Sequence, residues 1–314
     1  RRAVSCLSLR CRRQYAKNTI VSFFLSFFCA TFAQKKTQQT MDTSQNTNLQ
    51  SGGRRLTIRV SRHSLSFSAL KTGPEGSGVT FEPYTVRSGI SMAANLREAF
   101  KTAELPSMDF KRAMLMVDSP VLMVPVDMFC EPDADTLYRH SFPKQNADRV
   151  MFNVLPELNA VALFSVNKDL KLVVDDHFAD VRVNCAMTPV WKYLHQRSFI
   201  GTRSKLYGYF HDKKLEVFSF AQNRFKYCNA FDAGHAHDAL YFLLYVWKQL
   251  ALKPEHDEMH IVGDIPDREW ILEELRKFLL RAYVINPVGD FNRSPATLVK
   301  GMPYDLVAYY VKGR

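Results

Sequence analysis

A pattern of three strands, one helix and a further strand occurs twice in this chain, and it constrains the fold more than any other feature of the sequence. In its first occurrence the three strands are predicted at residues 56–60, 64–70 and 79–86. Apolar residues alternate along the first two segments, as is typical of strands buried on one face. Ser91 can cap the helix that follows. Residues 113–117 (AMLMV) are apolar throughout, which indicates a central strand buried on both faces.

The same order returns in the second part of the chain. Residues 205–210, 214–220 and 224–231 are predicted to form three strands joined by short turns. A strongly apolar helix is predicted at 235–252, and residues 259–262 (MHIV) form the next central strand. Antiparallel hairpins followed by a helical crossover produce a mixed sheet that is covered by helices. We therefore expect two similar sheets in one chain.

The repeated order resembles that of the ribonuclease-H-like fold, and two tandem copies resemble the actin, sugar kinase and heat-shock chaperone (ASKHA) superfamily. The predicted fold class is α/β with mixed sheets, arranged as a duplicated ribonuclease-H-like, actin-like fold of two domains. Residues 54–200 would form the first domain, including a hairpin at 150–155 and 160–166, and residues 201–314 the second. The chain of 314 residues is long enough for two domains, and its 46% hydrophobic content can fill both cores.

The sequence is similar to an uncharacterised bacterial family of actin-like proteins that carry no assigned activity. The similarity runs from about residue 56 to the C-terminus. Its most specific stretches are residues 124–129 (VPVDMF), residues 259–264 (MHIVGD) and the helix that follows at 271–279, together with the paired hairpin openings.

The resemblance also implies where a nucleotide would bind. In active members of the superfamily ATP lies between the two domains. The first hairpin of each domain has an Asp-x-Gly-type turn, whose glycine lets the backbone approach the phosphates. Here these turns are residues 61–63 (SRH) and 211–213 (HDK), and neither contains glycine. The Gly-Gly pair of the adenosine site is replaced by Gly263-Asp264. Asp212, Gly263 and Asp264 are therefore the candidate cofactor-binding residues if a nucleotide binds.

These losses predict a degenerate nucleotide-binding site. The predicted function is that of a non-catalytic scaffold or interaction protein. It would have no catalytic residue, no metal ligand, no required cofactor, and a protein partner that the sequence does not identify. The alternative is an ATP-binding protein, or a slow ATPase or phosphotransferase of the ASKHA superfamily, with Mg-ATP as its cofactor. Nucleotide occupancy separates the two hypotheses.

The positive charge of the chain is concentrated at its N-terminus. The formal net charge is +11, but residues 1–40 contain eight Lys and Arg and no acidic residue. Subtracting these eight from the 42 basic residues leaves 34 against 31 acidic residues, or +3. A nearly balanced body has no strong attraction for a phosphate backbone, so we predict no nucleic-acid partner.

Residues 1–53 are predicted to lie outside the folded body, as a leader or upstream segment followed by a polar tail. Basic residues precede an apolar run at 20–33, as in a signal peptide, and this run is too short to span a membrane. A second interpretation is that residues 1–40 lie upstream of a start at Met41. We expect a cytoplasmic protein without stable membrane insertion of its body, or an exported one if residues 1–33 are a signal peptide.

Three smaller features of the sequence concern possible thiol, metal-binding and anion-binding sites. The six cysteines include no CxxC pair, which predicts free thiols in a reducing compartment. His256 and His260 are four residues apart, and on a helix this spacing would let both bind one metal ion. The segment runs into a predicted strand, so we interpret it as a solvated loop. Arg197, Arg203 and Lys205 form a basic cluster that either meets an anion between the domains or belongs to a solvated linker.

Overall fold

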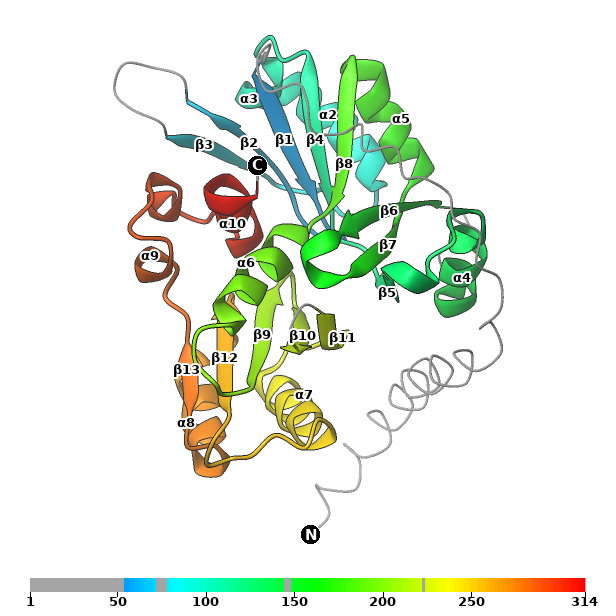
Figure 1. Cartoon of the computed structure of the whole chain (residues 1–314). Helices are drawn as coiled ribbons and strands as arrows, with labels where there is room; N and C mark the ends of the chain where they lie inside the picture. The colour runs from blue at the N-terminus through cyan, green and yellow to red at the C-terminus, as the bar shows by residue number, and fades with distance from the viewer. Residues whose placement is uncertain (1–53, 72–77, 144–147, 222–223, 314) are drawn as a thin grey trace. The chain divides into compact units, whose positions relative to one another are not determined.

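The computed structural model describes residues 54–71, 78–143, 148–221 and 224–313 (Figure 1). The expectations for residues 1–53 lie outside the described residues. Within the described part of the chain, no helix is long and apolar enough to cross a membrane.

Five strands form the first sheet, in the spatial order β3-β2-β1-β4-β8 (Figure 1). β1 pairs with β2, and β2 with β3, in antiparallel orientation, whereas β1, β4 and β8 are parallel. The strands predicted for the first occurrence of the pattern are confirmed. The bounds of the five strands are β1 Arg55–Val60, β2 Leu65–Leu70, β3 Val79–Tyr84, β4 Arg112–Val117 and β8 Asp180–Cys185.

The second sheet repeats this arrangement with the order β11-β10-β9-β12-β13. β9, β10 and β11 form the antiparallel meander, and β9, β12 and β13 are parallel. The duplication predicted from the sequence pattern is therefore present in the topology. The strand bounds are β9 Lys205–His211, β10 Lys214–Ala221, β11 Arg224–Asp232, β12 Glu258–Gly263 and β13 Ala282–Val284.

A smaller sheet is inserted in the first half of the chain, between β4 and β8. Its order is β5-β7-β6, and both pairings are antiparallel. The predicted hairpin corresponds to β6 and β7, whereas the sequence pattern does not predict β5. Helix α4 packs on one face of this sheet through Tyr138, whose neighbours include Leu122 and Leu163. The bounds are β5 Val121–Pro125, β6 Arg149–Leu155, β7 Ala160–Val166 and α4 Ala134–Ser141.

Helices α2 and α5 cover one face of the first sheet. α2 begins after Ser91, whose Oγ accepts the N–H of Ala94 at 3.2 Å, so the predicted cap is confirmed. Its buried residue Leu96 belongs to the same core cluster as Leu56 and Ile58 of β1. The helices of this layer are α2 Met92–Thr102, the short α3 Glu104–Ser107 and α5 Lys168–His177.

Helices α7 (Ala236–Gln249) and α8 (Arg268–Phe278) cover the corresponding face of the second sheet. They bury apolar residues such as Leu243 and Ile271 against Leu206 and Ile261 of the strands. The equivalent outer layers of the two halves are therefore both helical.

Helices α6 (Thr188–Ser198) and α10 (Tyr304–Lys312) lie between the two sheets and contact one another (Figure 1). On α10, Leu306 packs with Met116 of the first sheet. On α6, the ring of Trp191 meets Phe225 of β11 edge to face, with a centroid separation of 5.7 Å. The remaining short helices are α9 Pro287–Asp290 and the 3-10 turns Val126–Met128, Glu131–Asp133, Pro156–Leu158 and Pro295–Leu298.

One hydrophobic cluster extends through both halves. It contains Leu56 and Ile58 of β1 together with Tyr207 and Tyr209 of β9, and α6 contributes Trp191. Apolar burial therefore joins the two sheets, in addition to the polar contacts described next.

Candidate functional site

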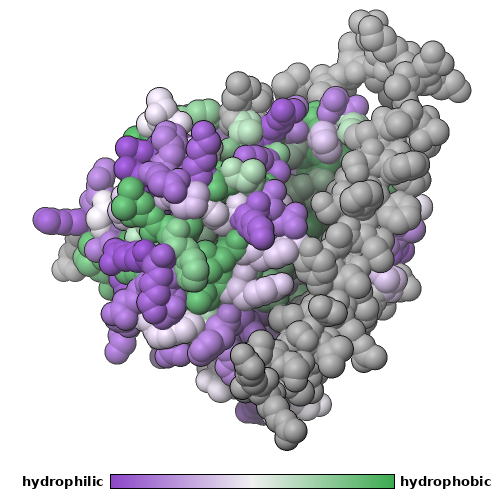
Figure 2. Space-filling view, turned by 90° about the horizontal axis from the view of Figure 1, so that it is seen from below, coloured by the Kyte–Doolittle hydropathy of each residue, from purple (hydrophilic) through white to green (hydrophobic). Residues whose placement is uncertain are grey.

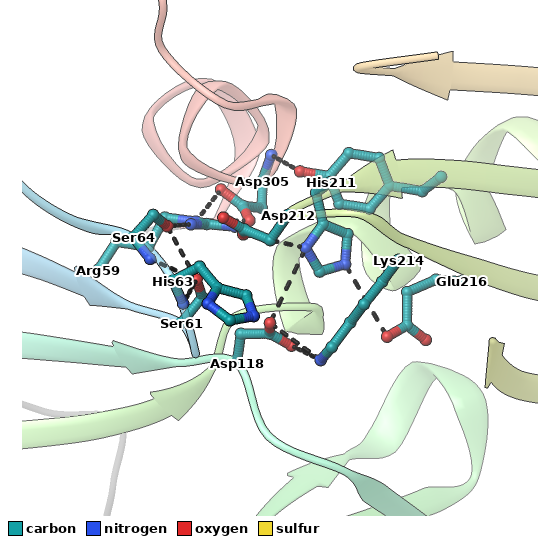
Figure 3. Close-up of polar contacts among 11 residues, drawn as sticks. Arg59, Ser61, His63, Ser64, Asp118, His211, Asp212, Lys214, Glu216 and Asp305 are labelled. Carbon is teal, nitrogen blue, oxygen red and sulfur yellow. Dashed lines mark hydrogen bonds and ion pairs between the residues drawn. The ribbon is translucent and has the colours of Figure 1, made fainter. Parts of the chain in front are cut away.

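The turns of the two equivalent hairpins meet in the folded chain (Figure 3). The first turn, residues 61–64, connects β1 to β2, and the second, residues 212–213, connects β9 to β10. Arg59 at the end of β1 links them, because its Nη2 donates to Asp212 Oδ2 at 2.9 Å and its Nη1 donates to Ser64 Oγ at 3.0 Å. The two halves are therefore held together where the superfamily resemblance places a nucleotide.

The first turn satisfies its own amide groups. Ser61 Oγ accepts the N–H of His63 at 3.3 Å and that of Ser64 at 3.1 Å. The N–H of Ser61 donates in turn to the carbonyl of Ser64 at 2.9 Å. Amides that point outward from a turn can bind anions, but these three already have acceptors within the turn.

The second turn has an unusual backbone. Asp212 and Lys213 have φ values of 46° and 62°, and His211 pairs with Lys214 at the base of the turn. Positive φ at both central residues is the type I′ geometry, which strongly favours glycine or asparagine. The hairpin therefore holds two side chains in a conformation that most residues avoid. Asp212 points inward from this turn, toward Arg59 (Figure 3).

Arg59 is also paired with the C-terminal helix. Its side chain is buried, and Nε donates to both carboxylate oxygens of Asp305, at 3.0 and 2.8 Å. Burial alone lowers the pKa of Arg59, but Asp305, Tyr209 and Asp212 together raise it above its ordinary value. Arg59 therefore stays charged and joins β1, α10 and the second hairpin.

His211 lies between three carboxylates. Its Nδ1 is 3.3 Å from Asp212 Oδ2 and 4.0 Å from Asp118 Oδ2, and its Nε2 is 3.9 Å from Glu216 Oε1. Burial alone lowers its pKa, but the hydrogen bond with Asp212 and the nearby carboxylates of Glu216 and Asp118 raise the pKa to about 9. The ring therefore carries a positive charge at neutral pH.

Lys214 ties the second hairpin to the end of β4. Its Nζ donates to the two carboxylate oxygens of Asp118 at 2.9 and 3.0 Å. The main-chain N–H of Asp118 donates to the carbonyl of Val60 at 2.8 Å, which places this carboxylate beside the first turn. Burial alone lowers the pKa of Lys214, but the charges of Asp118 and Glu216 raise it, so the ammonium group stays protonated.

Asp212 is the one predicted site residue that belongs to this network. Burial alone raises the pKa of its carboxyl group, but His211 and Arg59 lower the pKa well below its usual range. Asp212 is therefore ionised at neutral pH, and both cations hold it within the protein.

Gly263 is the last residue of β12, and Asp264 follows it at the same end of the second sheet. The N–H of Asp264 donates to the carbonyl of Phe210 at 2.9 Å. Gly263 has a φ of +101°, and a Cβ added to it would lie 2.0 Å from the same carbonyl oxygen. The close approach of β9 therefore explains the glycine without any ligand. Asp264 is exposed.

The histidine pair and the basic cluster predicted from the sequence form contacts within the protein. His256 contacts Asp257 at 2.9 Å and His260 contacts Glu258 at 3.0 Å, so the two imidazoles do not converge on one metal. In the basic cluster, Lys205 is buried, not solvated, and its Nζ donates to the Ile200 carbonyl at the end of α6. Arg197 pairs with Asp290, and Arg203 pairs with Glu258.

Sequence reasoning missed most of the network. Apart from Asp212, the sequence does not predict its members as site residues: Arg59, Asp118, His211, Lys214, Glu216 and Asp305. Two of them have a local signal: Asp118 directly follows an apolar central strand, and Asp305 is a lone acidic residue in an apolar helix segment (YDLVAYY). A charged residue inside an apolar run usually has a buried partner.

Among the described residues, one group has the composition and spacing to hold a metal ion. It consists of Asp118, His211 and Asp212, whose ligand atoms all lie within 4.8 Å of one another. Carboxylate oxygen and imidazole nitrogen are both common ligands of divalent metals.

Comparisons with known proteins agree with the fold. A family model described as a protein of unknown function (DUF3822) matches residues 42–281. A Bacteroides thetaiotaomicron VPI-5482 protein with an actin-like ATPase fold and unknown function is 28% identical. The alignment has a TM-score of 0.68 and covers 79% of this chain and 96% of that chain. A chain of the PilM–PilN type IV pilus biogenesis complex is 11% identical, with a TM-score of 0.52 over 82% of this chain and 97% of that chain. No curated protein matches the chain. The predicted two-domain, actin-like fold is therefore confirmed.

Proposed function

Because this chain belongs to the DUF3822 family of unknown function and has the actin-like ATPase fold, we propose that it is a non-catalytic scaffold or interaction protein with a degenerate nucleotide site. The observation that carries the proposal is the charge network between the two hairpins. Active members of the superfamily bind phosphates and a metal at this place, whereas here Arg59, His211 and Lys214 supply cations that belong to the protein.

The backbone of the two turns supports the same conclusion. A phosphate cradle needs free amides and close backbone approach. The amides of Ser61, His63 and Ser64 are already bound within the first turn. In the second turn, the side chain of Lys213 stands where an active relative has glycine.

The surface of the protein supports a role in binding other proteins. Several large apolar side chains are more than half exposed, among them Phe199, Ile200, Phe278 and Leu280. Apolar residues form a group bordered by hydrophilic ones on the face that Figure 2 shows. Exposed apolar groups of this kind are typical of interaction sites. One structurally similar chain, in the PilM–PilN complex, is part of an assembly of two different proteins.

Isothermal titration calorimetry of the whole chain with Mg-ATP tests the proposal. We expect no micromolar binding and no ATP hydrolysis. Arg62 and Lys213 are exposed charges that each contribute under about 1 kcal/mol, whereas micromolar affinity requires roughly 8 kcal/mol. Micromolar affinity that disappears in Asp212→Ala would overturn the proposal. Asp180→Ala, at the opposite end of the first sheet, is the matched control.

The alternative is an ATP-binding protein or a slow ATPase or phosphotransferase. The actin-like ATPase fold and the carboxylates at the junction favour it. Asp212, Gly263 and Asp264 would then contact Mg-ATP. Binding that is retained in Asp180→Ala but lost in Asp212→Ala would select this alternative.

We further propose a cytoplasmic location and no nucleic-acid partner. The cysteines of the described residues, Cys130, Cys185 and Cys228, are all free thiols, as expected in a reducing compartment. Cell fractionation of the chain with a C-terminal tag tests the location, and recovery of the tagged protein outside the cytoplasm would contradict it.

A further inference from the structure

We propose that Asp118, His211 and Asp212 form a binding site for a divalent transition-metal ion that links the two halves of the protein. The ligands come from protein side chains alone, so the site needs no nucleotide. The inference therefore goes beyond the proposed function and does not depend on it.

The positions of the ligand atoms fit such an ion. His211 Nδ1 is 3.3 Å from Asp212 Oδ2 and 4.0 Å from Asp118 Oδ2. Ligands about 2.1 Å from a tetrahedral zinc ion lie roughly 3.4 Å apart, so the first pair already has this spacing. Asp118 has to move closer, since the three ligand atoms lie within 4.8 Å of one another. Asp118 follows β4 of the first half, whereas His211 and Asp212 belong to the hairpin of the second half.

The buried charges favour a divalent cation. Four carboxylates, those of Asp118, Asp212, Glu216 and Asp305, face two permanent cations, Arg59 and Lys214. The formal charge of these six groups is −4 + 2 = −2. A net negative charge is costly in a buried site and favours a bound cation.

The surroundings of each ligand resemble those of established metal sites. A metal-bound imidazole usually donates its other N–H to a carboxylate. When Nδ1 holds the metal, His211 Nε2 faces Glu216, which is 3.9 Å away. This nitrogen is buried and has no hydrogen-bond partner among the described residues. Arg59 fixes Asp212, and the main chain fixes Asp118 beside Val60.

Lys214 competes with the metal for Asp118. Its ammonium group contacts both oxygens of that carboxylate, but the side chain is 21% exposed and can turn toward solvent. Two substitutions should therefore act in opposite directions. Asp118→Asn removes a charged ligand and weakens binding, whereas Lys214→Met removes the competitor and strengthens it.

The test uses Mn²⁺ and the whole chain, freed of metal by dialysis. Mn²⁺ is chosen because it prefers oxygen and nitrogen ligands, while the cysteines of the chain would bind Zn²⁺ elsewhere. Electron paramagnetic resonance measures free Mn²⁺ during a titration. We expect one ion per chain, at least tenfold weaker binding in Asp118→Asn, and tighter binding in Lys214→Met. Asp180→Asn and Lys171→Met are matched controls outside the network, and both should bind like the wild type.

A wild-type chain that binds no Mn²⁺, or an Asp118→Asn variant with unchanged affinity, overturns the proposal. If circular dichroism shows that Asp118→Asn is unfolded, Lys214→Met decides the question, because unchanged affinity in that variant also overturns it. Separate titration of the metal-free protein with Mg-ATP distinguishes this outcome from failure of the proposed function.

Discussion

Among single residues, Gly263 shows how a position that resembles a ligand site can be explained by the fold alone. Its φ of +101° is unfavourable for any other residue, and a Cβ would lie 2.0 Å from the carbonyl oxygen of Phe210. Neither this Cβ nor the carbonyl oxygen of Phe210 can move without disturbing the pairing of β9 and β12. The glycine at this position therefore does not report on nucleotide binding.

Gly263→Ala should lower the free energy of unfolding by more than about 2 kcal/mol, even without any ligand, because it combines a strained backbone with a clash. Urea denaturation measures the change. Gly234→Ala is the control, since nothing lies within 4 Å of its Cβ position, and it should change stability by less than about 0.5 kcal/mol. Equal stability of the two variants would contradict the explanation.

Among the elements, the hairpin of β9 and β10 combines an unfavourable turn with a precise placement of side chains. Its two central residues both have positive φ, and neither is glycine. The turn keeps this conformation because Asp212 is bound by Arg59, and because β9 and β10 pair with each other and also with β12 and β11. Strain in the turn is thus offset by the contacts of the network.

Lys213→Gly should stabilise the protein by up to about 1 kcal/mol, because glycine adopts positive φ without steric penalty. Thermal unfolding followed by circular dichroism measures the difference. The same exchange at Lys101, an exposed position in the last turn of α2, should instead destabilise by up to about 1 kcal/mol, because glycine has a low helix propensity. Destabilisation by Lys213→Gly would show that the turn is not strained.

At the scale of the whole molecule, helix α10 lies at the junction of the two halves. α10 packs on the first sheet, contacts α6 and carries Asp305, which is fully buried against Arg59. The hydroxyl of Tyr310 also reaches Thr57 and Ser68 on the first sheet, at 3.0 Å each. The last residues of the chain therefore stabilise the junction of both halves.

Arg59→Met should lower the free energy of unfolding by about 3–5 kcal/mol, because it leaves the buried carboxylate of Asp305 without its cation and Asp212 with His211 alone. The double variant Arg59→Met/Asp305→Leu should recover part of this loss, since the most buried of those carboxylates is also removed. Chemical denaturation of both variants tests this pair. Lys101→Met, which breaks only an exposed ion pair, serves as control and should lose less than about 1 kcal/mol. An Arg59→Met variant as stable as this control would contradict the role of the network.

The sequence by itself determined the repeated order of strands and helices, because alternation of apolar residues and helix caps are local properties. It also identified the hairpin turn that holds Asp212, since the turn lies between two segments of clear strand pattern. It did not predict β5, a short edge strand whose formation depends on pairing with β7.

Only the tertiary structure decided which charged residues meet. Arg59 and Asp305 are 246 positions apart, and Asp118 and Lys214 are 96 apart. No local pattern encodes such a pair, because it depends on which faces of two sheets and a terminal helix come together. Lone charges in apolar segments show that partners are needed, but the identity of each partner follows from packing. The candidate site was therefore visible in the sequence through Asp212, whereas its other members became apparent from the fold.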